Sequence, residues 1–367
     1  MNHDEFVNQS MLTCIGNKRR LLKNIVDTIK ELKIDKHKLN IFDGFAGSSV
    51  VSRELSQFAD NLYVNDLEPY SYAMAYCYFK KPTDEQIVMI KSHIDKMNTM
   101  IDEKEFTSGF ISELYAPKDD RNIERGERCF YTTINGKIID TCMKYIHEIV
   151  ESELFYYCIV PLLIKASIHV NTAGVFKGFY KNKKGIGQFG GEKRDALDRI
   201  EKQIRLEYPV WSDNRFTGHV FNKDVNESIK ELPDDIDVVY FDPPYNQHPY
   251  SSNYFMLNLI LSNKPPENPS RVSGIPSDWN RSEYNYKKRA IESMEDLIQQ
   301  TIVKTRYIIV SYNNEGIIGE DDWKSILSEY EYTKKTIKYD AYKGSRNLKN
   351  RSDKVEEILY IINLKNK

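Results

Sequence analysis

The sequence is poor in cysteine and has none of the cysteine spacings that build a structural site. The five cysteines among its 367 residues are scattered and odd in number, and none forms a C-x-x-C pair; they are Cys14, Cys77, Cys129, Cys142 and Cys158. This pattern disfavours both a disulfide framework and a zinc site. We therefore expect reduced thiols and no bound metal.

Long apolar runs and a secretory signal are missing as well. No apolar run approaches the roughly 20 residues that a membrane helix requires, and the N-terminal residues MNHDE lack the basic start of a signal peptide. We expect a soluble, cytoplasmic protein without a membrane partner. The net charge of −2 neither favours nor excludes a polyanionic partner, so local clusters of charge must decide that point.

What is present is the pattern of a nucleotide-binding α/β fold. Apolar residues recur at helical spacing from 16 to 34, behind a Gly-Asn turn. Four elements follow: a short strand at 41–43, a tight glycine loop at 44–47, a helix at 48–58 capped by Ser48 or Ser49, and a strand at 62–66. A strand, a glycine loop, a helix and a strand that ends in an acid form the first half of a doubly wound, Rossmann-like sheet.

The pattern changes in the middle of the chain. From 83 to 215 we predict an inserted, mainly helical region, with a helical stretch at 138–168 that is kinked or broken at Pro161 and a loop or short hairpin at 170–194. The sheet then resumes, with strands at 218–221, 237–241, 307–311, 332–339 and 358–362 and helices at 290–301 and near Trp323. The catalytic domain is thus predicted to consist of 1–82 and 216–367.

Four residues at the end of one buried strand carry the clearest chemistry. Asp242, Pro243, Pro244 and Tyr245 follow the apolar stretch 237–241. Each proline disfavours the helical region for the residue before it, so the chain stays extended and the Pro243 carbonyl can point outward. The Asp242 carboxylate and that carbonyl can accept both hydrogens of one exocyclic amine, while the Tyr245 ring offers a face for a planar base. The structural alternative is a strand that ends in an ordinary Pro-Pro loop.

The glycine loop predicts a nucleoside site. Residues 43–47 let the backbone approach a ligand, and Asp66 ends the next strand, where an acid can accept ribose hydroxyls. The loop lacks the G-x-G-x-x-G pattern of dinucleotide sites, so a nucleoside cofactor without phosphates fits better than NAD. Capping of a turn or a helix is the alternative role for Asp43 and Asp66.

These motifs, in this order, resemble those of the alpha-group, Dam-type N6-adenine DNA methyltransferases. The resemblance is carried by 13–22 (TCIGNKRRLL), 42–47 (FDGFAG), 64–66 (VND) and 242–245 (DPPY). The longer run 242–254 (DPPYNQHPYSSNY) is similar to modification enzymes of type II restriction systems, such as the FokI methylases. The family pattern is broken at two positions: Cys14 stands where an aromatic residue is usual, and Ser49 replaces the second glycine of the loop.

The resemblance implies S-adenosylmethionine as the methyl donor. Lys18 and the backbone around Cys14 would contact its methionine part, Asp66 its ribose and Asp224 its adenine, with Asp242 between the cofactor and the target. The expected cofactor contacts are Cys14, Gly16, Lys18, Asp43, Phe45, Gly47, Asp66, Asp224 and Asp242.

The resemblance also implies that the acceptor is N6 of an adenine in duplex DNA. A base inside a duplex cannot reach such a pocket, so the adenine must swing out of the helix. Tyr245 would stack on it, catalysis would depend on Asp242, Pro243, Pro244 and Tyr245, and the insert at 83–215 would recognise the DNA target.

Two clusters of basic residues with interleaved aromatic residues predict contacts to DNA phosphates. They span 334–351 and 177–194, and the residues expected to touch DNA are Lys181, Lys183, Lys184, Lys343, Arg346 and Arg351. A shorter basic and aromatic run at 284–289 is a third candidate. An ordinary solvated surface is the alternative for each cluster.

The leading hypothesis is therefore the modification enzyme of a restriction-modification system, a monomer that acts on duplex DNA apart from any cognate restriction endonuclease. Methylation of an exocyclic amine in RNA is a second hypothesis, because related folds place the same Asp-Pro-Pro-Tyr run against guanine amines of ribosomal RNA. The insert and the Gly-Asn-Lys turn favour DNA. A non-catalytic nucleic-acid-binding protein is a third hypothesis, and the intact Asp242, Pro243 and Tyr245 argue against it.

Overall fold

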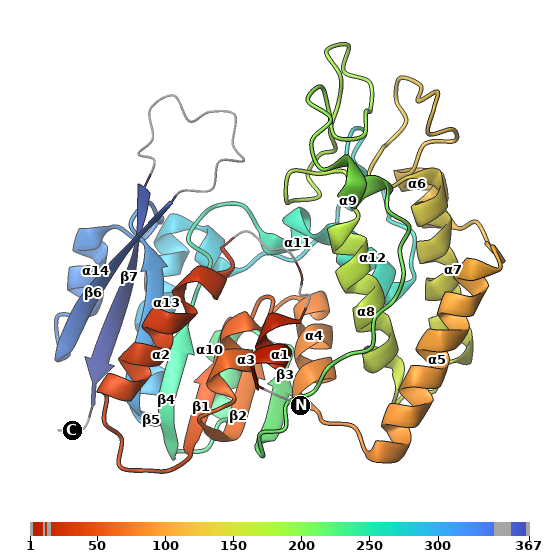
Figure 1. Ribbon diagram of the computed structural model, residues 1–367. Coiled ribbons are helices and arrows are strands. Elements are labelled where there is room, and N and C mark those ends of the chain that lie inside the picture. Colours follow the sequence, from red (N-terminus) through yellow and green to blue (C-terminus); the bar gives the residue numbers. More distant parts are fainter. Residues whose placement is uncertain (1–2, 10–11, 13–15, 341–353, 365–367) are drawn as a thin grey trace.

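The computed structural model describes residues 3–9, 12, 16–340 and 354–364, and a sheet occupies one side of the molecule (Figure 1). In these residues the sheet has seven strands: β1 (Leu39–Asp43), β2 (Ala59–Asn65), β3 (Thr217–Phe221), β4 (Ile236–Phe241), β5 (Thr305–Asn313), β6 (Tyr332–Asp340) and β7 (Lys354–Asn363). Their order is β3-β2-β1-β4-β5-β7-β6. β1 to β5 are parallel, whereas β7 is antiparallel to both β5 and β6.

The order of the strands confirms the predicted doubly wound, Rossmann-like fold. The chain runs outward from β1 to β2 and β3 on one side, and then from β4 to β5 on the other. The winding therefore reverses between β1 and β4, and ligands bind beyond the carboxyl ends of the strands at such a switch point. All seven strands expected from the sequence are present, within a few residues of their predicted bounds.

Helices cover both faces of the sheet (Figure 1). The larger apolar core contains residues of α2 (Leu22–Glu31), α3 (Val50–Leu55) and α4 (Pro69–Phe79). The second core contains residues of α10 (Val225–Ser228), α13 (Lys287–Thr301) and α14 (Glu320–Ile326). Val238 and Tyr240 of β4 face the first core, and Val239 and Phe241 face the second. A strand that is buried on both faces explains why 237–241 is a nearly continuous apolar run.

Between α4 and β3 the chain leaves the sheet and forms a helical region beside it (Figure 1). Its helices are α5 (Asp84–Asp102), α6 (Phe110–Tyr115), α7 (Thr133–Ile149), α8 (Phe155–Ile168) and α9 (Leu197–Glu201). α7 and α8 pack against α12 (Phe255–Ser262) from the second half of the chain. All three share the larger core with β1 and β4, so the helical region is continuous with the sheet. Target recognition by residues 83–215 remains a prediction.

Two local expectations differ from the structure. The stretch 138–168 breaks between Ile149 and Phe155, whereas Pro161 lies inside α8, because burial holds this apolar helix together despite the missing N–H. The helix expected from Ser48 begins at Val50, because Ser49 adopts a left-handed conformation with φ 62° and its hydroxyl caps nothing. This backbone conformation favours glycine, the residue that the resemblance leads us to expect at this position.

No helix in the described ranges is both long enough and apolar enough to cross a membrane.

Candidate active site

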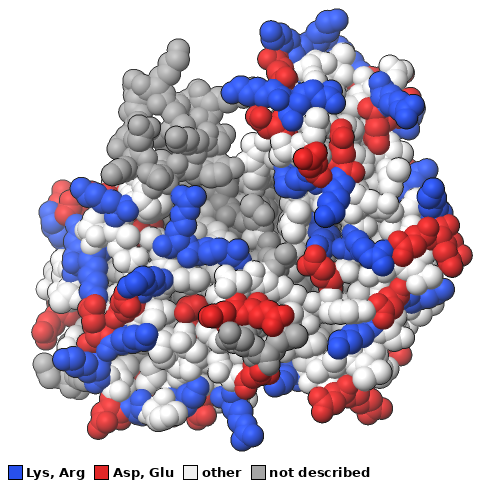
Figure 2. Space-filling model, in the orientation of Figure 1, with Lys and Arg blue, Asp and Glu red and all other residues white. Residues whose placement is uncertain are grey.

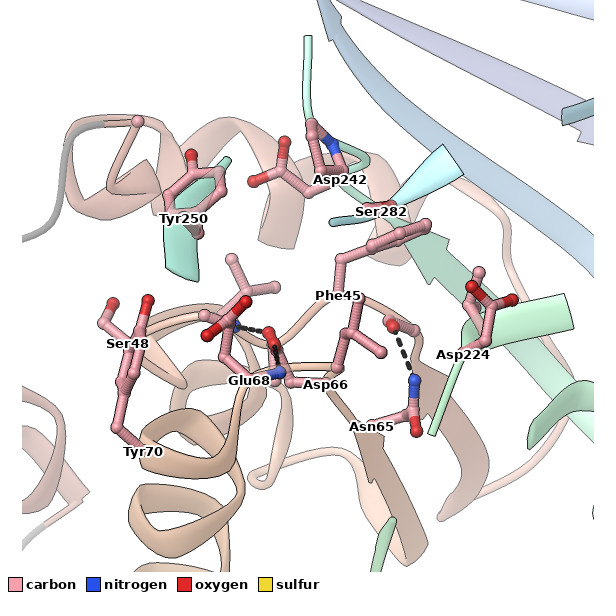
Figure 3. Close-up of a pocket in the computed structure, with 18 of the residues that line it drawn as sticks. Phe45, Ser48, Asn65, Asp66, Glu68, Tyr70, Asp224, Asp242, Tyr250 and Ser282 are labelled. Atoms are coloured by element: carbon pink, nitrogen blue, oxygen red, sulfur yellow. Dashed lines mark hydrogen bonds between the residues drawn. The ribbon is translucent and has the colours of Figure 1, made fainter. Parts of the chain in front are cut away.

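The carboxyl ends of β1, β2 and β4 open into one pocket (Figure 3). Its empty volume is about 950 Å³ with its open mouth included, and its lining includes the glycine loop, Asp66 and Asp242. Asp66 follows β2 and Asp242 follows β4, and these strands flank β1. The parallel sheet therefore brings together two acidic strand ends that are far apart in the sequence.

The loop between β1 and α3 forms one wall of the pocket. Gly47 has a positive φ of 53°, and its N–H donates to Asp66 Oδ2 at 2.7 Å. The N–H of Glu68 donates to Asp66 Oδ1 at 2.8 Å. Burial raises the pKa of the Asp66 carboxyl, and these backbone donors oppose the rise. Each carboxylate oxygen has a second lone pair, so Asp66 can still accept ligand hydroxyls.

The opposite end of the loop packs against α10. A Cβ added to Gly44 would lie 2.7 Å from the Phe241 ring and 2.9 Å from Val225 Cγ2, so only glycine fits there without movement. Asp224 caps α10 by accepting the N–H of Asn226 at 2.9 Å, and it lines the same pocket. Burial raises the pKa of Asp224. An acid thus lies at each end of this wall.

Asp43 lies behind the pocket wall and is absent from the described residues that line it. It is 1% exposed, and the Ser52 hydroxyl donates to its carboxyl at 2.5 Å. Burial raises the pKa of Asp43 to about 7. The carboxyl therefore ties α3 to β1, and this placement does not favour its predicted contact with a cofactor.

The remaining expected cofactor contacts gather in the pocket. Those that line it are Gly16, Lys18, Phe45, Gly47, Asp66, Asp224 and Asp242. Cys14 lies outside the described residues.

Lys18, the first residue of the short helix η1 (Lys18–Leu21), holds Asp242. Its Nζ lies 2.7 Å from Asp242 Oδ1 and donates to the Gly16 carbonyl at 3.3 Å. Burial alone would lower the pKa of Lys18, but Asp242 and Glu357 raise it well above its usual value. Burial raises the pKa of Asp242 to about 6, against the influence of Lys18. Both groups are therefore mainly ionised at pH 7.

The aromatic side chain that faces Asp242 across the pocket is Tyr250, the first residue of α11 (Tyr250–Asn253) (Figure 3). Pro244 also lines the pocket, whereas Pro243 is buried and Tyr245 packs against the second core. A Cβ added to Gly16 would lie 3.1 Å from Tyr250 Oη and 3.2 Å from Tyr245 Oη, so both hydroxyls converge there. Stacking of a base on Tyr245 stays a prediction, and Tyr250 is a second candidate for that role.

Glu68 and Glu357 were not foreseen from the sequence. Glu68 lines the pocket and accepts a hydrogen bond from Asn258 Nδ2 at 3.1 Å. Burial, reinforced by the charge of Asp66, raises the pKa of Glu68 to about 8, so it is mainly neutral at pH 7. Glu357 lies on β7, 3.3 Å from Lys18 Nζ. The signal that could have identified Glu357 is its spacing of two residues from Leu359 and four from Ile361, which places an acid on the same face as these apolar residues.

The predicted DNA-binding residues Lys181, Lys183 and Lys184, in the cluster at 177–194, lie in a loop of the helical region. Lys183 and Lys184 are exposed, and one antiparallel bridge between Lys181 and Gly187 closes the turn that contains them. This part of the chain extends beyond α9 in Figure 1, and Figure 2 shows basic side chains at the same end of the molecule. Such a position is open to a large ligand such as DNA.

The cluster at 334–351 is described only in part, because Lys343, Arg346 and Arg351 lie outside the described residues. Its three lysines on β6 each form an ion pair with a glutamate: Lys334 with Glu320, Lys335 with Glu31 and Lys338 with Glu356. For the described part of this cluster, these ion pairs favour an ordinary charged surface over contacts to DNA. In the third candidate, Tyr284 is buried in the core and Arg289 pairs with Glu283, whereas Lys287 and Lys288 are exposed.

The sequence profile of the D12 class N6 adenine-specific DNA methyltransferase family matches residues 15–326. Modification methylase StsI from Streptococcus sanguinis is 31% identical over 374 residues, which cover 96% of this chain and 52% of that protein. Type II methyltransferase M.CviAII from Paramecium bursaria Chlorella virus 1 is 28% identical, over 86% of this chain and 87% of that protein. Type II methyltransferase M.NlaIII from Neisseria lactamica is 27% identical, over 95% and 98% respectively. The chain thus spans about half the length of StsI and nearly all of M.NlaIII.

Proposed function

The chain belongs to the family of D12 class N6 adenine-specific DNA methyltransferases, and from this premise we propose that it transfers the methyl group of S-adenosylmethionine to N6 of a flipped-out adenine in duplex DNA. The observation that carries the proposal is the position of Asp242. Its carboxylate lies at the end of β4 in the pocket that also contains Asp66 and the glycine loop (Figure 3). A donor and an acceptor amine would meet there.

The residues around Asp242 suit methylation of an exocyclic amine. Such an amine is a poor nucleophile because its lone pair is delocalised into the aromatic ring. Hydrogen bonds from its two hydrogens to the Asp242 carboxylate and the Pro243 carbonyl would favour a pyramidal nitrogen and stabilise its developing positive charge. Even with a pKa raised to about 6, the Asp242 carboxylate is too weak a base to deprotonate a neutral amine, so the nitrogen loses its proton after it gains the methyl group.

The lining of the pocket fits S-adenosylmethionine, which supplies an electrophilic methyl group on a sulfonium when it is bound. The Asp66 carboxylate, oriented by two backbone donors, suits ribose hydroxyls, and Asp224 suits an adenine amino group. The Phe45 ring, packed edge-on against Phe241, offers an apolar surface. Lys18 is engaged with Asp242, so its main role in the proposed site is to orient that carboxylate.

DNA would be held by the helical region. We propose that residues 83–215 recognise the target sequence and that Lys181, Lys183 and Lys184 contact phosphates. The names of the relatives favour a role as the modification enzyme of a restriction-modification system. We propose further that the protein works as a monomer in the cytoplasm, separately from any cognate endonuclease.

Replacement of Asp242 tests this function. Asp242→Ala should abolish transfer of labelled methyl from S-adenosylmethionine to duplex DNA, while calorimetry still detects binding of the cofactor. Asp60→Ala, an exposed aspartate in β2, is the matched control and should keep full activity. Duplex DNA, single strands and ribosomal RNA are offered in competition, and preferred methylation of RNA would point to the alternative substrate. Full turnover in the Asp242 variant would contradict the proposal.

A further inference from the structure

Glu357 is the third charged member of the cluster that contains Lys18 and Asp242. The ammonium of Lys18 lies 2.7 Å from Asp242 Oδ1 and 3.3 Å from Glu357 Oε1, and it also donates to the Gly16 carbonyl. These three acceptors match the three N–H bonds of an ammonium group. Asp242 and Glu357 therefore share one positive charge, which leaves the ionised cluster with a net negative charge.

Glu357 reaches this cluster from the C-terminal strand of the sheet. β7 runs antiparallel between β5 and β6, so its first residues lie at the carboxyl edge of the sheet, where Glu357 is paired with Asn313. The side chains of Glu357 and Ile358 lie on opposite faces of the sheet. Glu357 shares its face with Leu359, toward the larger core. Glu357 is 1% exposed.

The sheet supplies further donors to the Glu357 carboxylate. Ser311 Oγ, on β5, donates to Oε1 at 2.5 Å, and Tyr339 Oη, on β6, donates to Oε2 at 3.4 Å. A buried acid beside a second buried acid costs free energy, and an apolar side chain at such a position is often at least as stabilising. A purely structural role therefore explains Glu357 poorly, and its contact with the Lys18–Asp242 pair offers a functional reason.

Building on the proposed function, we propose that Glu357 is a positioning residue, which acts through Lys18 to orient the Asp242 carboxylate and to keep the cluster negative. With Lys18 alone, Asp242 would belong to a neutral ion pair. When Glu357 shares the ammonium, Asp242 stays a stronger acceptor for the N–H of the target amine. The net negative charge also stabilises the positive charge that develops on the nitrogen as it gains the methyl group.

Glu357→Gln tests this role, because glutamine keeps the size of the side chain and an acceptor for Ser311 but removes the charge. We expect kcat to fall by about tenfold or more, and KM for both substrates to change by less than about threefold. The acid limb of kcat/KM should move to lower pH, because Glu357 raises the pKa of Asp242. Glu356→Gln is the matched control: this neighbour pairs with Lys338, and its variant should keep the kcat and the pH profile of the wild type.

Other titratable groups near Asp242 do not account for the expected shift in the acid limb of kcat/KM. Those whose charges interact with Asp242 are Asp43 on β1, Tyr240 on β4, and Tyr245 and Tyr250 beyond it. Burial raises the pKa of each of these tyrosine hydroxyls, so they stay neutral in the acid range. Asp43 is present in the wild type and in both the Glu357→Gln and Glu356→Gln variants, so its own titration is common to the pH profiles that are compared.

A titration of ¹³C-labelled aspartate carboxyls, with Asp242 assigned through Asp242→Asn, measures the same shift without turnover. A wild-type kcat in Glu357→Gln, or a reduced kcat with an unmoved Asp242 titration, would overturn the inference. If Glu357→Gln does not fold, Glu357→Asp is the second variant, because it moves the carboxylate away from Lys18 by one methylene. It should show the same changes in kcat and in the Asp242 titration, to a smaller degree. Wild-type kcat and titration in Glu357→Asp would also contradict the proposed role of Glu357. A wild-type protein that methylates no DNA would instead contradict the proposed function, and the titration would still decide the role of Glu357.

Discussion

A fall in pH should switch off methyl transfer by protonating Asp242. Burial raises the pKa of this carboxyl from 3.8 to about 6, while Lys18 opposes the rise. The acceptor is the ionised form, so activity is present above this pKa and is lost as the pH falls through it. About nine tenths of the molecules should have an ionised Asp242 at pH 7 and about one tenth at pH 5. A carboxyl with an ordinary pKa would still be about nine tenths ionised at pH 5.

The assay is kcat/KM for DNA between about pH 4.5 and pH 8.5 at constant ionic strength, because this parameter reports groups of the free enzyme. Two other buried acids titrate within this range, since burial raises the pKa of Asp43 to about 7 and that of Glu68 to about 8. Asp43→Asn should leave the acid limb in place, and circular dichroism at each pH separates titration from unfolding. A limb near pH 4, or one that disappears in Asp43→Asn, would refute the assignment to Asp242.

Two further predictions concern the glycine loop and the lysine-rich loop. Gly44→Ala should destabilise the protein by about 1–3 kcal/mol through overpacking, whereas Gly178→Ala should have little effect, because an added Cβ there meets nothing within 4 Å. Urea unfolding measures both, and equal stability of the two variants would contradict the packing argument. Replacement of Lys183 and Lys184 with alanine should weaken DNA binding and reduce the slope of log Kd against log salt by about 2. Lys96→Ala on α5 should not change this slope, and an unchanged slope in the double variant would remove the loop from the DNA surface.

Local patterns were sufficient to predict the strands and the residues at their ends. The run 237–241 is apolar because β4 is buried on both faces, and such a run has few alternative structures. Helix ends were harder to predict. Ser49 takes a left-handed conformation that its residue type does not favour, and Pro161 lies inside a helix that its residue type tends to break. In both places the packing of neighbouring elements outweighed the local preference.

The sequence by itself determined that acids follow β2 and β4, and a parallel sheet places the carboxyl ends of such strands at one edge, so the pocket followed from local patterns. Only the tertiary structure decided what surrounds Asp242. Lys18 comes from the start of the chain and Glu357 from its last strand, and they meet because β7 runs antiparallel between β5 and β6. No local period in a sequence records a contact between residues so far apart, and the charge of the candidate active site depends on that contact.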